Sequence, residues 1–332
     1  MKTLLKRMIR KLRTEREIEP QLRAGELKWL MNELTYFRRR GFISGSVWTS
    51  PEETPTRLQL MSSNGEILGE APFINEEVIN EEEGLSHFGL EVALTDSSEL
   101  LDVWTRVVFE DNTCIEVKNL VGRITDVDPY HQLANRFFKE CRELGKSNPN
   151  ARVLEIGSRA RSGHVRRELV APMQYLGLDI LPGENTDIVG DVHNLSALLE
   201  PESFDALFSI STFEHLAMPW KAVLEMNSVL KVGGRVLISS HQAFPLHDQP
   251  WDLWRFSDTA WYSLFNEATG FKIIETALGE PASVVAHLLH EVTNTLETQP
   301  AYLGSTVLVE KVGNTELSWP VDVGVTQVGY PQ

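Results

Sequence analysis

The sequence predicts an α/β protein, with a doubly wound, mostly parallel sheet of seven strands preceded by helices and a small antiparallel β-sandwich. Two observations carry this prediction. From residue 151 onward, short apolar runs alternate with helical patterns, which is typical of a buried parallel sheet with crossover helices. Between about residues 42 and 117, short runs of alternating polarity are separated by turn residues, which is typical of a sandwich.

These patterns divide the chain into four segments. A helix is expected from about Pro20 to Arg40, because apolar residues fall on one helical face and Gly41 follows a basic last turn. The expected segments are a basic helical segment 1–40, a β-sandwich accessory domain 41–120, an α/β domain 121–312 and an irregular tail 313–332. In the α/β domain a helix is expected around 130–144, and the seven strands are expected near 153–156, 174–179, 188–190, 206–210, 235–239, 272–275 and 306–310.

Charge restricts the classes of partner. The net charge of -16 argues against a general nucleic-acid binder, which needs a basic surface. Residues 1–40 nevertheless carry 12 Lys and Arg against 5 Glu, and residues 1–13 form a basic amphipathic pattern. Such a helix can lie on an anionic membrane surface as a peripheral contact. It can equally dock on the acidic body of the chain or on a partner subunit of a homo-oligomer, and the sequence leaves these alternatives open.

The compartment is expected to be reducing. Two cysteines, Cys114 and Cys141, cannot form a disulfide framework or a thiolate metal cage. No apolar run approaches the roughly 20 residues that span a bilayer, and charges interrupt the first 13 residues, which therefore lack a signal-peptide core. We therefore expect a cytoplasmic protein.

A ligand-binding corner is expected where the first strand of the α/β domain ends. The run Val153-Leu154-Glu155-Ile156 suits a buried strand, and Gly157 and Ser158 then begin a small-residue turn that leads to a helical pattern near Ser162. Open α/β sheets bind ligands beyond the carboxyl ends of such strands. By itself this signal is also compatible with a purely structural turn.

The segment from about Ala151 to Lys311 resembles class I S-adenosylmethionine-dependent methyltransferases of the type 11 kind, which have a Rossmann-like sheet. The resemblance lies in the order and spacing of four later stretches. They are Tyr175-Leu176-Gly177-Leu178-Asp179-Ile180, Gly190-Asp191-Val192-His193-Asn194-Leu195, the run 203–216 containing Ser211, and the run 224–239 with its Gly233-Gly234 turn. The resemblance implies S-adenosylmethionine as cofactor.

The resemblance also implies roles for individual residues. Glu155 would orient the amino end of the cofactor, and the alternative is a carboxylate that only caps local amides. Asp179, with Ile180 beside it, would accept hydrogen bonds from the ribose hydroxyls. The remaining cofactor-binding roles fall to the Gly157-Ser158 turn, to Asp191 at the adenine amino group, to the backbone amide of Val192 and to Ser211 beside the methyl donor. Arg159 replaces the middle glycine of the family's usual Gly-x-Gly-x-Gly, so the turn departs from the pattern there.

Catalytic candidates lie in the stretch 239–257, which follows the fifth strand. Methyl transfer mainly requires alignment of donor and acceptor, and a hydroxyl acceptor must also lose its proton. His247 or His241 could act as that base, or both could hold the loop through backbone hydrogen bonds. Asp252 and Arg255 are expected to form an internal ion pair. No metal site is expected, because no Asp/His cluster has obvious ligand spacing.

The leading hypothesis is therefore an enzyme that methylates a hydroxyl of a glycan or small-molecule metabolite, with no nucleic-acid partner. One alternative is a non-catalytic binding or scaffold protein that keeps the fold, which Arg159 in the glycine turn favours. The other is an NAD-dependent sugar-modifying oxidoreductase, which should show the G-x-G-x-x-G fingerprint that this sequence lacks.

Overall fold

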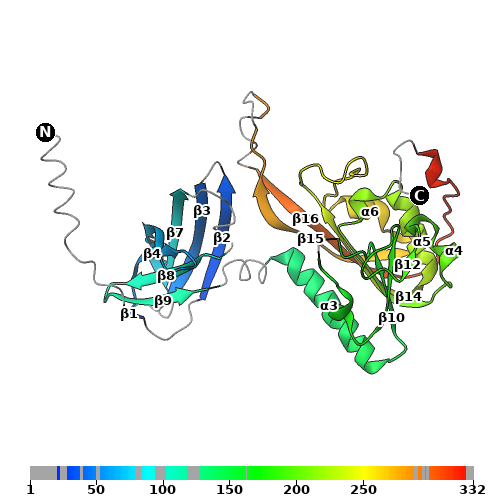
Figure 1. Cartoon of the computed structure of the whole chain (residues 1–332), viewed down its shortest axis with the longest axis horizontal. Coiled ribbons are helices and arrows are strands. Elements are labelled where there is room, and N and C mark those ends of the chain that lie inside the picture. The colour runs from blue at the N-terminus through cyan, green and yellow to red at the C-terminus, as the bar shows by residue number, and fades with distance from the viewer. Residues whose placement is uncertain are drawn as a thin grey trace, which may run out of the picture. The chain divides into compact units, whose positions relative to one another are not determined.

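The computed structural model divides the chain into two compact units, residues 1–126 and 127–332 (Figure 1). The structure describes residues 21–22, 28–37, 40–49, 53–78, 84–93, 102–118, 128–161, 163–286, 291–293, 296 and 299–326. The basic amphipathic pattern 1–13 lies outside these residues, as does Ser162. Among the helices that are described, none is long and apolar enough to cross a membrane.

The first unit is a β-sandwich, as predicted. One sheet has the order β1-β9-β8-β4-β5 and the other has the order β2-β3-β7-β6. Apolar side chains from both sheets share one core, with Ile43 and Phe88 from one sheet against Leu58 and Val107 from the other. The strands are β1 (Gln21–Leu22), β2 (Lys28–Phe37), β3 (Arg40–Thr49), β4 (Pro55–Met61), β5 (Ile67–Pro72), β6 (Ile74–Val78), β7 (Gly84–Ala93), β8 (Trp104–Phe109) and β9 (Thr113–Val117).

The helix expected over Pro20–Arg40 is wrong, because this stretch contributes strands β1 and β2. β2 pairs antiparallel with β3 from Lys28 opposite Trp48 to Phe37 opposite Arg40. The apolar spacing fits a helical face, but the same stretch is rich in aromatic residues that favour strands. Pairing with β3 gives β2 backbone hydrogen bonds along its length, and this tertiary arrangement overrides the local periodicity.

The second unit contains the predicted seven-stranded sheet, in the order β12-β11-β10-β13-β14-β16-β15. Strands β10 to β14 are parallel, whereas β16 runs antiparallel between β14 and β15. The seven predicted strands are thereby confirmed. They are β10 (Arg152–Ile156), β11 (Gln174–Asp179), β12 (Ile188–Val189), β13 (Phe204–Ile210), β14 (Leu230–His241), β15 (Phe271–Ser283) and β16 (Pro300–Lys311).

Both faces of this sheet are covered, which explains why the central strands β10 and β13 are buried along most of their length. Helix α3 buries Phe137 and Phe138 with Val153 and Phe208 on one face. Helix α5 buries Met226 with Leu154 and other side chains on the opposite face. The helices are α3 (Pro129–Ser147), α4 (Leu195–Leu198), α5 (Pro219–Val229) and α6 (Ala260–Leu264), and the 3-10 turns are η2 (Arg167–Val170), η3 (Val192–Asn194), η4 (Phe213–His215), η5 (Glu267–Thr269) and η7 (Val323–Val325).

The connection after β10 differs from the helical pattern expected near Ser162. In the described part of residues 157–173, the sole helical turn is the four-residue η2. The side chain of Arg142 in α3 donates a hydrogen bond to the carbonyl oxygen of Leu169 in η2 at 2.9 Å. This connection is therefore held by side chains from its neighbours in place of a regular crossover helix.

The side chain of Lys311 is a fully buried cation. Lys311, at the end of β16, is 0% exposed. Its Nζ atom donates to the carbonyl oxygens of Asn227 and Leu230, both at 2.7 Å, and lies 3.3 Å from Oε1 of Glu202. These carbonyls belong to the end of α5 and the start of β14, where a helix leaves acceptors without partners in its own backbone. Lys311 therefore fixes the α5–β14 junction to the last strand.

The tail after Val312 is irregular, as expected, except for the short turn η7. In its described part it packs against the second unit. Val323 is buried with Ala217 and Met218, and Nζ of Lys221 donates to the carbonyl oxygen of Val321 at 2.8 Å. The tail to residue 326 is therefore anchored beside α5 and is not a loose extension.

Candidate active site at the carboxyl ends of the parallel strands

The residues expected to bind a cofactor lie at the carboxyl ends of neighbouring parallel strands. Asp191 follows β12, Asp179 ends β11, Gly157 follows β10 and Ser211 follows β13. His241 ends β14, the next strand in the sheet. The sheet order therefore brings these positions to one edge, which is where open α/β sheets bind ligands.

Gly157 makes the turn after β10. Its φ angle is +77°, a left-handed conformation that glycine adopts without strain. A Cβ atom at this position would lie 2.0 Å from Oγ1 of Thr212, so a side chain does not fit. The backbone N–H groups of Gly157 and Ser158 both donate to the carbonyl oxygen of Leu178, at 2.8 and 3.1 Å. Ser158 is buried, and its Oγ atom has no hydrogen-bond partner within the described protein.

Asp179 is positioned by backbone groups. Its Oδ1 accepts a hydrogen bond from the N–H of Leu181 at 3.0 Å, and its Oδ2 accepts one from the N–H of Arg159 at 3.2 Å. A carboxylate has about four acceptor positions, so these two bonds leave capacity for two further donors. The residue is 9% exposed, and Ile180 after it is half-buried. Asp179 is therefore held in place and still able to accept hydrogen bonds.

The side chain of Arg159 lies toward this aspartate. Its Nε atom is 3.8 Å from Oδ1 of Asp179 and is buried without a hydrogen-bond partner. Its aliphatic part rests against Gly183, where an added Cβ would lie 2.6 Å from Cγ of Arg159. The side chain that replaces the second glycine thus covers part of the turn and stands beside the carboxylate expected to hold the ribose.

Asp191 and His193 form a short chain of hydrogen bonds. Oδ1 of Asp191 accepts from the backbone N–H of His193 at 2.9 Å and lies 2.6 Å from its Nδ1. Nε2 of the same ring accepts from the N–H of Met218 at 3.1 Å, which assigns the ring proton to Nδ1. Burial acts to raise the pKa of Asp191, but the hydrogen bonds from His193 outweigh it and hold that pKa below its usual value. Val192 between them is buried.

Glu155 is engaged mainly by other side chains. It is 1% exposed, and its carboxylate accepts hydrogen bonds from the hydroxyl of Tyr175, from Arg166 at 3.4 Å and from Asn185 at 3.2 Å. Burial raises the pKa of Glu155 above its ordinary value, although these hydrogen bonds oppose that effect. The geometry is that of a carboxylate which ties the loops after β10 and β11 together.

Ser211 follows β13 and is exposed, with a φ angle of +52°. Its N–H donates to the carbonyl oxygen of Ser239 in β14 at 2.9 Å. Across the same edge, the guanidinium of Arg161 forms an ion pair with Asp248, with one of its contacts at 2.5 Å. The loops after β10 and β14 are therefore joined directly above the strand ends.

The two candidate bases come together in a cluster of histidines around one buried glutamate. Nε2 of His241 lies 3.2 Å from Oε1 of Glu214, and Nε2 of His215 lies 3.8 Å from the same oxygen. The ring of His247 is 5.3 Å from that of His241 and 5.0 Å from that of His215. His241 also stacks on Phe244 at 4.2 Å. The structure therefore places both candidates in one site.

Glu214 itself is 0% exposed. Its Oε2 accepts a hydrogen bond from Oγ of Ser240 at 2.7 Å, whereas Oε1 has no well-directed hydrogen bond. Burial acts to raise the pKa of Glu214, but contacts with His241 and Ser240 outweigh it and keep that pKa below its usual value. A buried carboxylate thus faces the histidines in its ionised form.

Asp252 and Arg255 form the internal ion pair expected from the sequence. Two guanidinium nitrogens of Arg255 lie 2.6 and 2.8 Å from the Asp252 carboxylate. This contact outweighs burial and lowers the pKa of Asp252 far below its usual value. Asp252 also accepts the backbone N–H of His247 at 2.9 Å. The pair therefore shapes the loop that carries His247.

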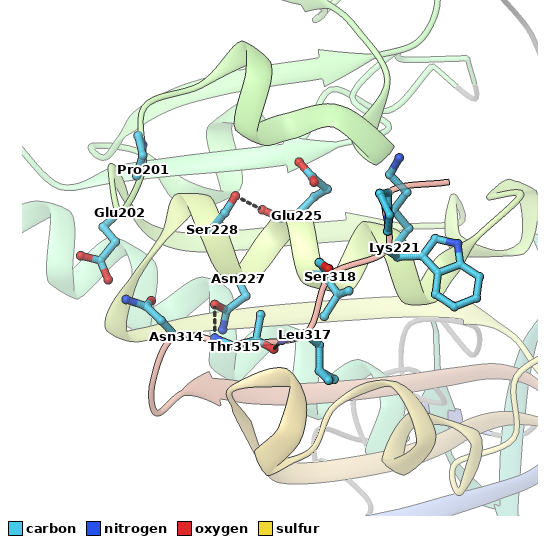
Figure 2. Close-up of a pocket in the computed structure, with 13 residues that line it drawn as sticks. Pro201, Glu202, Lys221, Glu225, Asn227, Ser228, Asn314, Thr315, Leu317 and Ser318 are labelled. Atoms are coloured by element: carbon cyan, nitrogen blue, oxygen red, sulfur yellow. Dashed lines mark hydrogen bonds between the residues drawn. The ribbon is translucent and has the colours of Figure 1, made fainter. Parts of the chain in front are cut away.

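A groove of about 540 Å³ lies elsewhere in this unit, along α5 and the tail (Figure 2). Glu225, Asn227 and Ser228 contribute its α5 side, and Thr315 and Leu317 contribute its tail side. Glu202, which precedes β13, also lines it. It is lined by none of the residues at the strand ends, so we do not assign the reaction to it.

Sequence reasoning found most of these positions but missed the contacts that organise them. The sequence pattern does not identify Glu214, Ser240, Tyr175 or Asn185 as parts of the site. Tyr175 contacts Glu155, which is 20 residues away in sequence, and Ser240 contacts Glu214, which is 26 residues away. Such contacts have no local signature, because they arise when neighbouring strands bring their ends together.

Comparison with known proteins agrees with this geometry. A family model described as "Methyltransferase domain" matches residues 154–238. A search of curated protein sequences finds no significant match.

Many solved structures match part of the chain. One is a SAM-dependent methyltransferase from Archaeoglobus fulgidus, with 16% identity, a TM-score of 0.38, and coverage of 55% of this chain and 100% of the other. Another is the YcgJ protein from Bacillus subtilis, with 18% identity, a TM-score of 0.39, and coverage of 54% and 97%. A third is a 1,6-didemethyltoxoflavin-N1-methyltransferase from Burkholderia thailandensis bound to S-adenosylhomocysteine, with 12% identity, a TM-score of 0.37, and coverage of 55% and 84%. The identities and TM-scores are too low for these structures to indicate a substrate.

Proposed function

We propose that this chain, which carries a class I S-adenosylmethionine-dependent methyltransferase domain, methylates a hydroxyl group of a sugar or another small metabolite. The observation that supports the choice of a hydroxyl is the pair formed by His241 and the buried Glu214 at the carboxyl ends of the central strands. A hydroxyl acceptor must lose a proton, and a histidine held by a carboxylate suits that task near neutral pH.

The strand ends fit the methyl donor. Asp179 keeps about two acceptor positions for the two ribose hydroxyls, and Asp191 keeps an oxygen for the adenine amino group beside the amide of Val192. The Oγ atom of Ser158 is buried without a partner and can bind a polar group of the ligand. Gly157 and Ser211 line the turns between these groups. Glu155 acts mainly by holding the turn, through Tyr175, Arg166 and Asn185.

When bound, S-adenosylmethionine supplies a sulfonium methyl group, whose carbon–sulfur bond breaks as a carbon–oxygen bond forms, leaving S-adenosylhomocysteine. The chain has to align the two reactants and take up the acceptor proton. His241 takes up that proton, and the ionised Glu214 beside it stabilises the imidazolium that results. Asp252 and Arg255 hold the loop with His247 over this edge.

Other features of the chain suit a small-molecule or glycan acceptor. The acidic net charge disfavours nucleic acid, and the sandwich of the first unit could serve as an accessory domain for the acceptor. Both cysteines are free and buried, as suits the cytoplasm. Assembly into a homo-oligomer and peripheral membrane contact through residues 1–13 stay part of this proposal.

The proposal is tested in two steps on the full chain. Calorimetric titration with S-adenosylhomocysteine, with NAD as the control ligand, tests the donor site. A screen with radiolabelled S-adenosylmethionine then compares sugars and nucleotide-sugars with amine and carboxylate acceptors. We expect transfer to a hydroxyl compound, lowered about 100-fold or more in His241→Gln with little change in S-adenosylhomocysteine affinity. Transfer to amines alone, or full activity of His241→Gln, would refute the hydroxyl proposal.

A further inference from the structure

The buried Glu214 lacks a permanent cationic partner. It is 0% exposed, and within the described residues the basic side chains that lie beside its carboxylate are those of His215 and His241 alone. The neighbouring buried carboxylate differs, because Asp252 is neutralised by the guanidinium of Arg255 at 2.6 Å. Burying a carboxylate costs free energy unless a cation or several hydrogen bonds compensate it. Nε2 of His241 lies 3.2 Å from Oε1 of Glu214, but Oε1 has no well-directed hydrogen bond and can still bind a ligand.

Two histidines present ring nitrogens to this oxygen. One ligand atom each from Glu214, His215 and His247 lies within 4.8 Å of the other two. Nε2 of His215 is 3.8 Å from Oε1 of Glu214. Ligands of a tetrahedral zinc ion with bonds of about 2.0–2.1 Å are separated by about 3.4 Å. Binding of an ion would therefore require small rotations of the two rings about their side-chain bonds.

The Nδ1 atom of each ring contacts a carbonyl oxygen, as is usual for histidines that bind metal ions through Nε2. Nδ1 of His215 lies 3.0 Å from the carbonyl oxygen of Trp251. Nδ1 of His247 lies 3.2 Å from the carbonyl oxygen of Pro245 and 3.3 Å from Oδ2 of Asp252. A carbonyl accepts a proton but cannot donate one, so each Nδ1 carries the hydrogen and each Nε2 keeps its lone pair. Metal-ligating histidines almost always have this second contact, which fixes the tautomer and the ring.

From these contacts we propose that Glu214, His215 and His247 bind one divalent transition-metal ion of the zinc class. Two imidazoles and one carboxylate suit Zn²⁺, Fe²⁺ or Ni²⁺ better than Mg²⁺ or Ca²⁺, which prefer sites made of oxygen atoms. Three protein ligands leave a coordination position open, as in catalytic zinc sites. Spacing along the chain does not reveal this site, because His247 lies 32 residues beyond His215 and reaches it through the loop after β14.

The position of the site suggests its use. Glu214 and His215 belong to η4 after β13, and His247 lies in the loop after β14, at the edge where the acceptor is expected. A divalent ion there would bind the acceptor hydroxyl oxygen and ease loss of its proton to His241, which lies 3.2 Å from Glu214. This part of the inference rests on the proposed function, whereas metal binding itself does not.

The test uses the untagged full chain, stripped with a chelator. Zn²⁺ is titrated by calorimetry against a competing chelator, and Co²⁺ binding is followed by its visible absorption. We expect one equivalent of Zn²⁺ with a Kd in the micromolar range or tighter, and tetrahedral or five-coordinate Co²⁺ bands. His215→Ala and His247→Ala should each weaken Zn²⁺ binding at least 30-fold. The matched control is His131→Ala, since His131 also lies near a carboxylate, with Nε2 3.0 Å from Glu280, and it should bind Zn²⁺ normally.

Absence of stoichiometric Zn²⁺ binding by the intact chain, or equal Zn²⁺ affinity in all three variants, would overturn the metal proposal. Titration of each protein with S-adenosylhomocysteine separates this outcome from failure of the proposed function. Variants that still bind S-adenosylhomocysteine but not Zn²⁺ are folded and support the site. If a variant loses binding of both ligands, His247→Gln is titrated in its place, together with the Co²⁺ spectrum of the intact chain. Loss of Zn²⁺ binding with retained S-adenosylhomocysteine binding supports the site, whereas unchanged Zn²⁺ binding or absence of the Co²⁺ bands overturns it. An intact chain that binds Zn²⁺ but not S-adenosylhomocysteine would refute the methyl-donor site and leave the metal site standing.

Discussion

Replacing Asp179 with alanine should weaken binding of S-adenosylhomocysteine about 100-fold. The carboxylate is held by the N–H groups of Arg159 at 3.2 Å and Leu181 at 3.0 Å, which leaves two acceptor positions for the ribose hydroxyls. Hydrogen bonds to a charged acceptor contribute about 1.5–3 kcal/mol each. Partial replacement by water brings the loss for two such bonds to about 3 kcal/mol, and each 1.4 kcal/mol is about tenfold in affinity.

The substitution also affects the folded protein. It leaves the two backbone N–H groups without their acceptor, which should lower the free energy of unfolding of the second unit by about 1–2 kcal/mol. Asp179→Asn keeps one oxygen as an acceptor and should lose about tenfold in affinity. Calorimetric titration of the folded proteins measures these affinities, and circular dichroism confirms that each variant is folded.

Asp205 provides the matched control. It also accepts a backbone N–H, from Arg152 at 2.8 Å, and pairs with Lys231 at 2.7 Å, but it lies at the amino end of β13, on the opposite edge of the sheet. Asp205→Ala should therefore cost stability and leave the affinity for S-adenosylhomocysteine unchanged. If Asp179→Ala binds S-adenosylhomocysteine within twofold of the intact chain, the reasoning about the ribose site is refuted.

Three further substitutions test the fold around the site. Lys311→Met removes a buried ammonium from two main-chain carbonyls and should lower the free energy of unfolding by about 3 kcal/mol. The loss is measured as faster hydrogen exchange in β14 and β16. Unchanged exchange would contradict the role assigned to Lys311. Gly157→Ala places a Cβ 2.0 Å from Oγ1 of Thr212 at a φ of +77°. It should lower the free energy of unfolding by more than about 2 kcal/mol and abolish binding of S-adenosylhomocysteine. Normal binding in a calorimetric titration would argue against this geometry. The hydrogen bond with Glu280 outweighs burial and raises the pKa of His131, and the same contact lowers the pKa of Glu280. This partly exposed pair therefore stabilises the fold at pH values between the ordinary pKa values of the two groups. The stabilisation is lost as pH rises through the raised pKa of His131. His131→Gln should therefore lower stability by about 0.5 kcal/mol near about pH 5.5 and have no effect near about pH 9, and equal losses at both pH values in urea titrations would count against the pair.

The sequence by itself determined the architecture of the second unit. Its seven strands and helix α3 were predictable, because a parallel sheet covered on both faces requires continuous apolar runs and these stand out from their surroundings. The acids at the ends of strands were predictable for the same reason: Asp179 and Asp191 follow strands that the pattern identifies. The sandwich was predictable from short runs of alternating polarity between turn residues.

Tertiary structure alone decided three other matters. The segment Lys28–Phe37 has a helical spacing of apolar residues, but pairing with β3 makes it a strand. In its described part, the connection after β10 contains the four-residue 3-10 turn η2 where a helix was expected. The cluster of Glu214, His215, His241 and His247 forms because adjacent parallel strands end at the same edge of the sheet. Sequence patterns record periodicity over neighbouring residues, whereas strand pairing and side-chain clusters depend on which distant segments the sheet order makes neighbours.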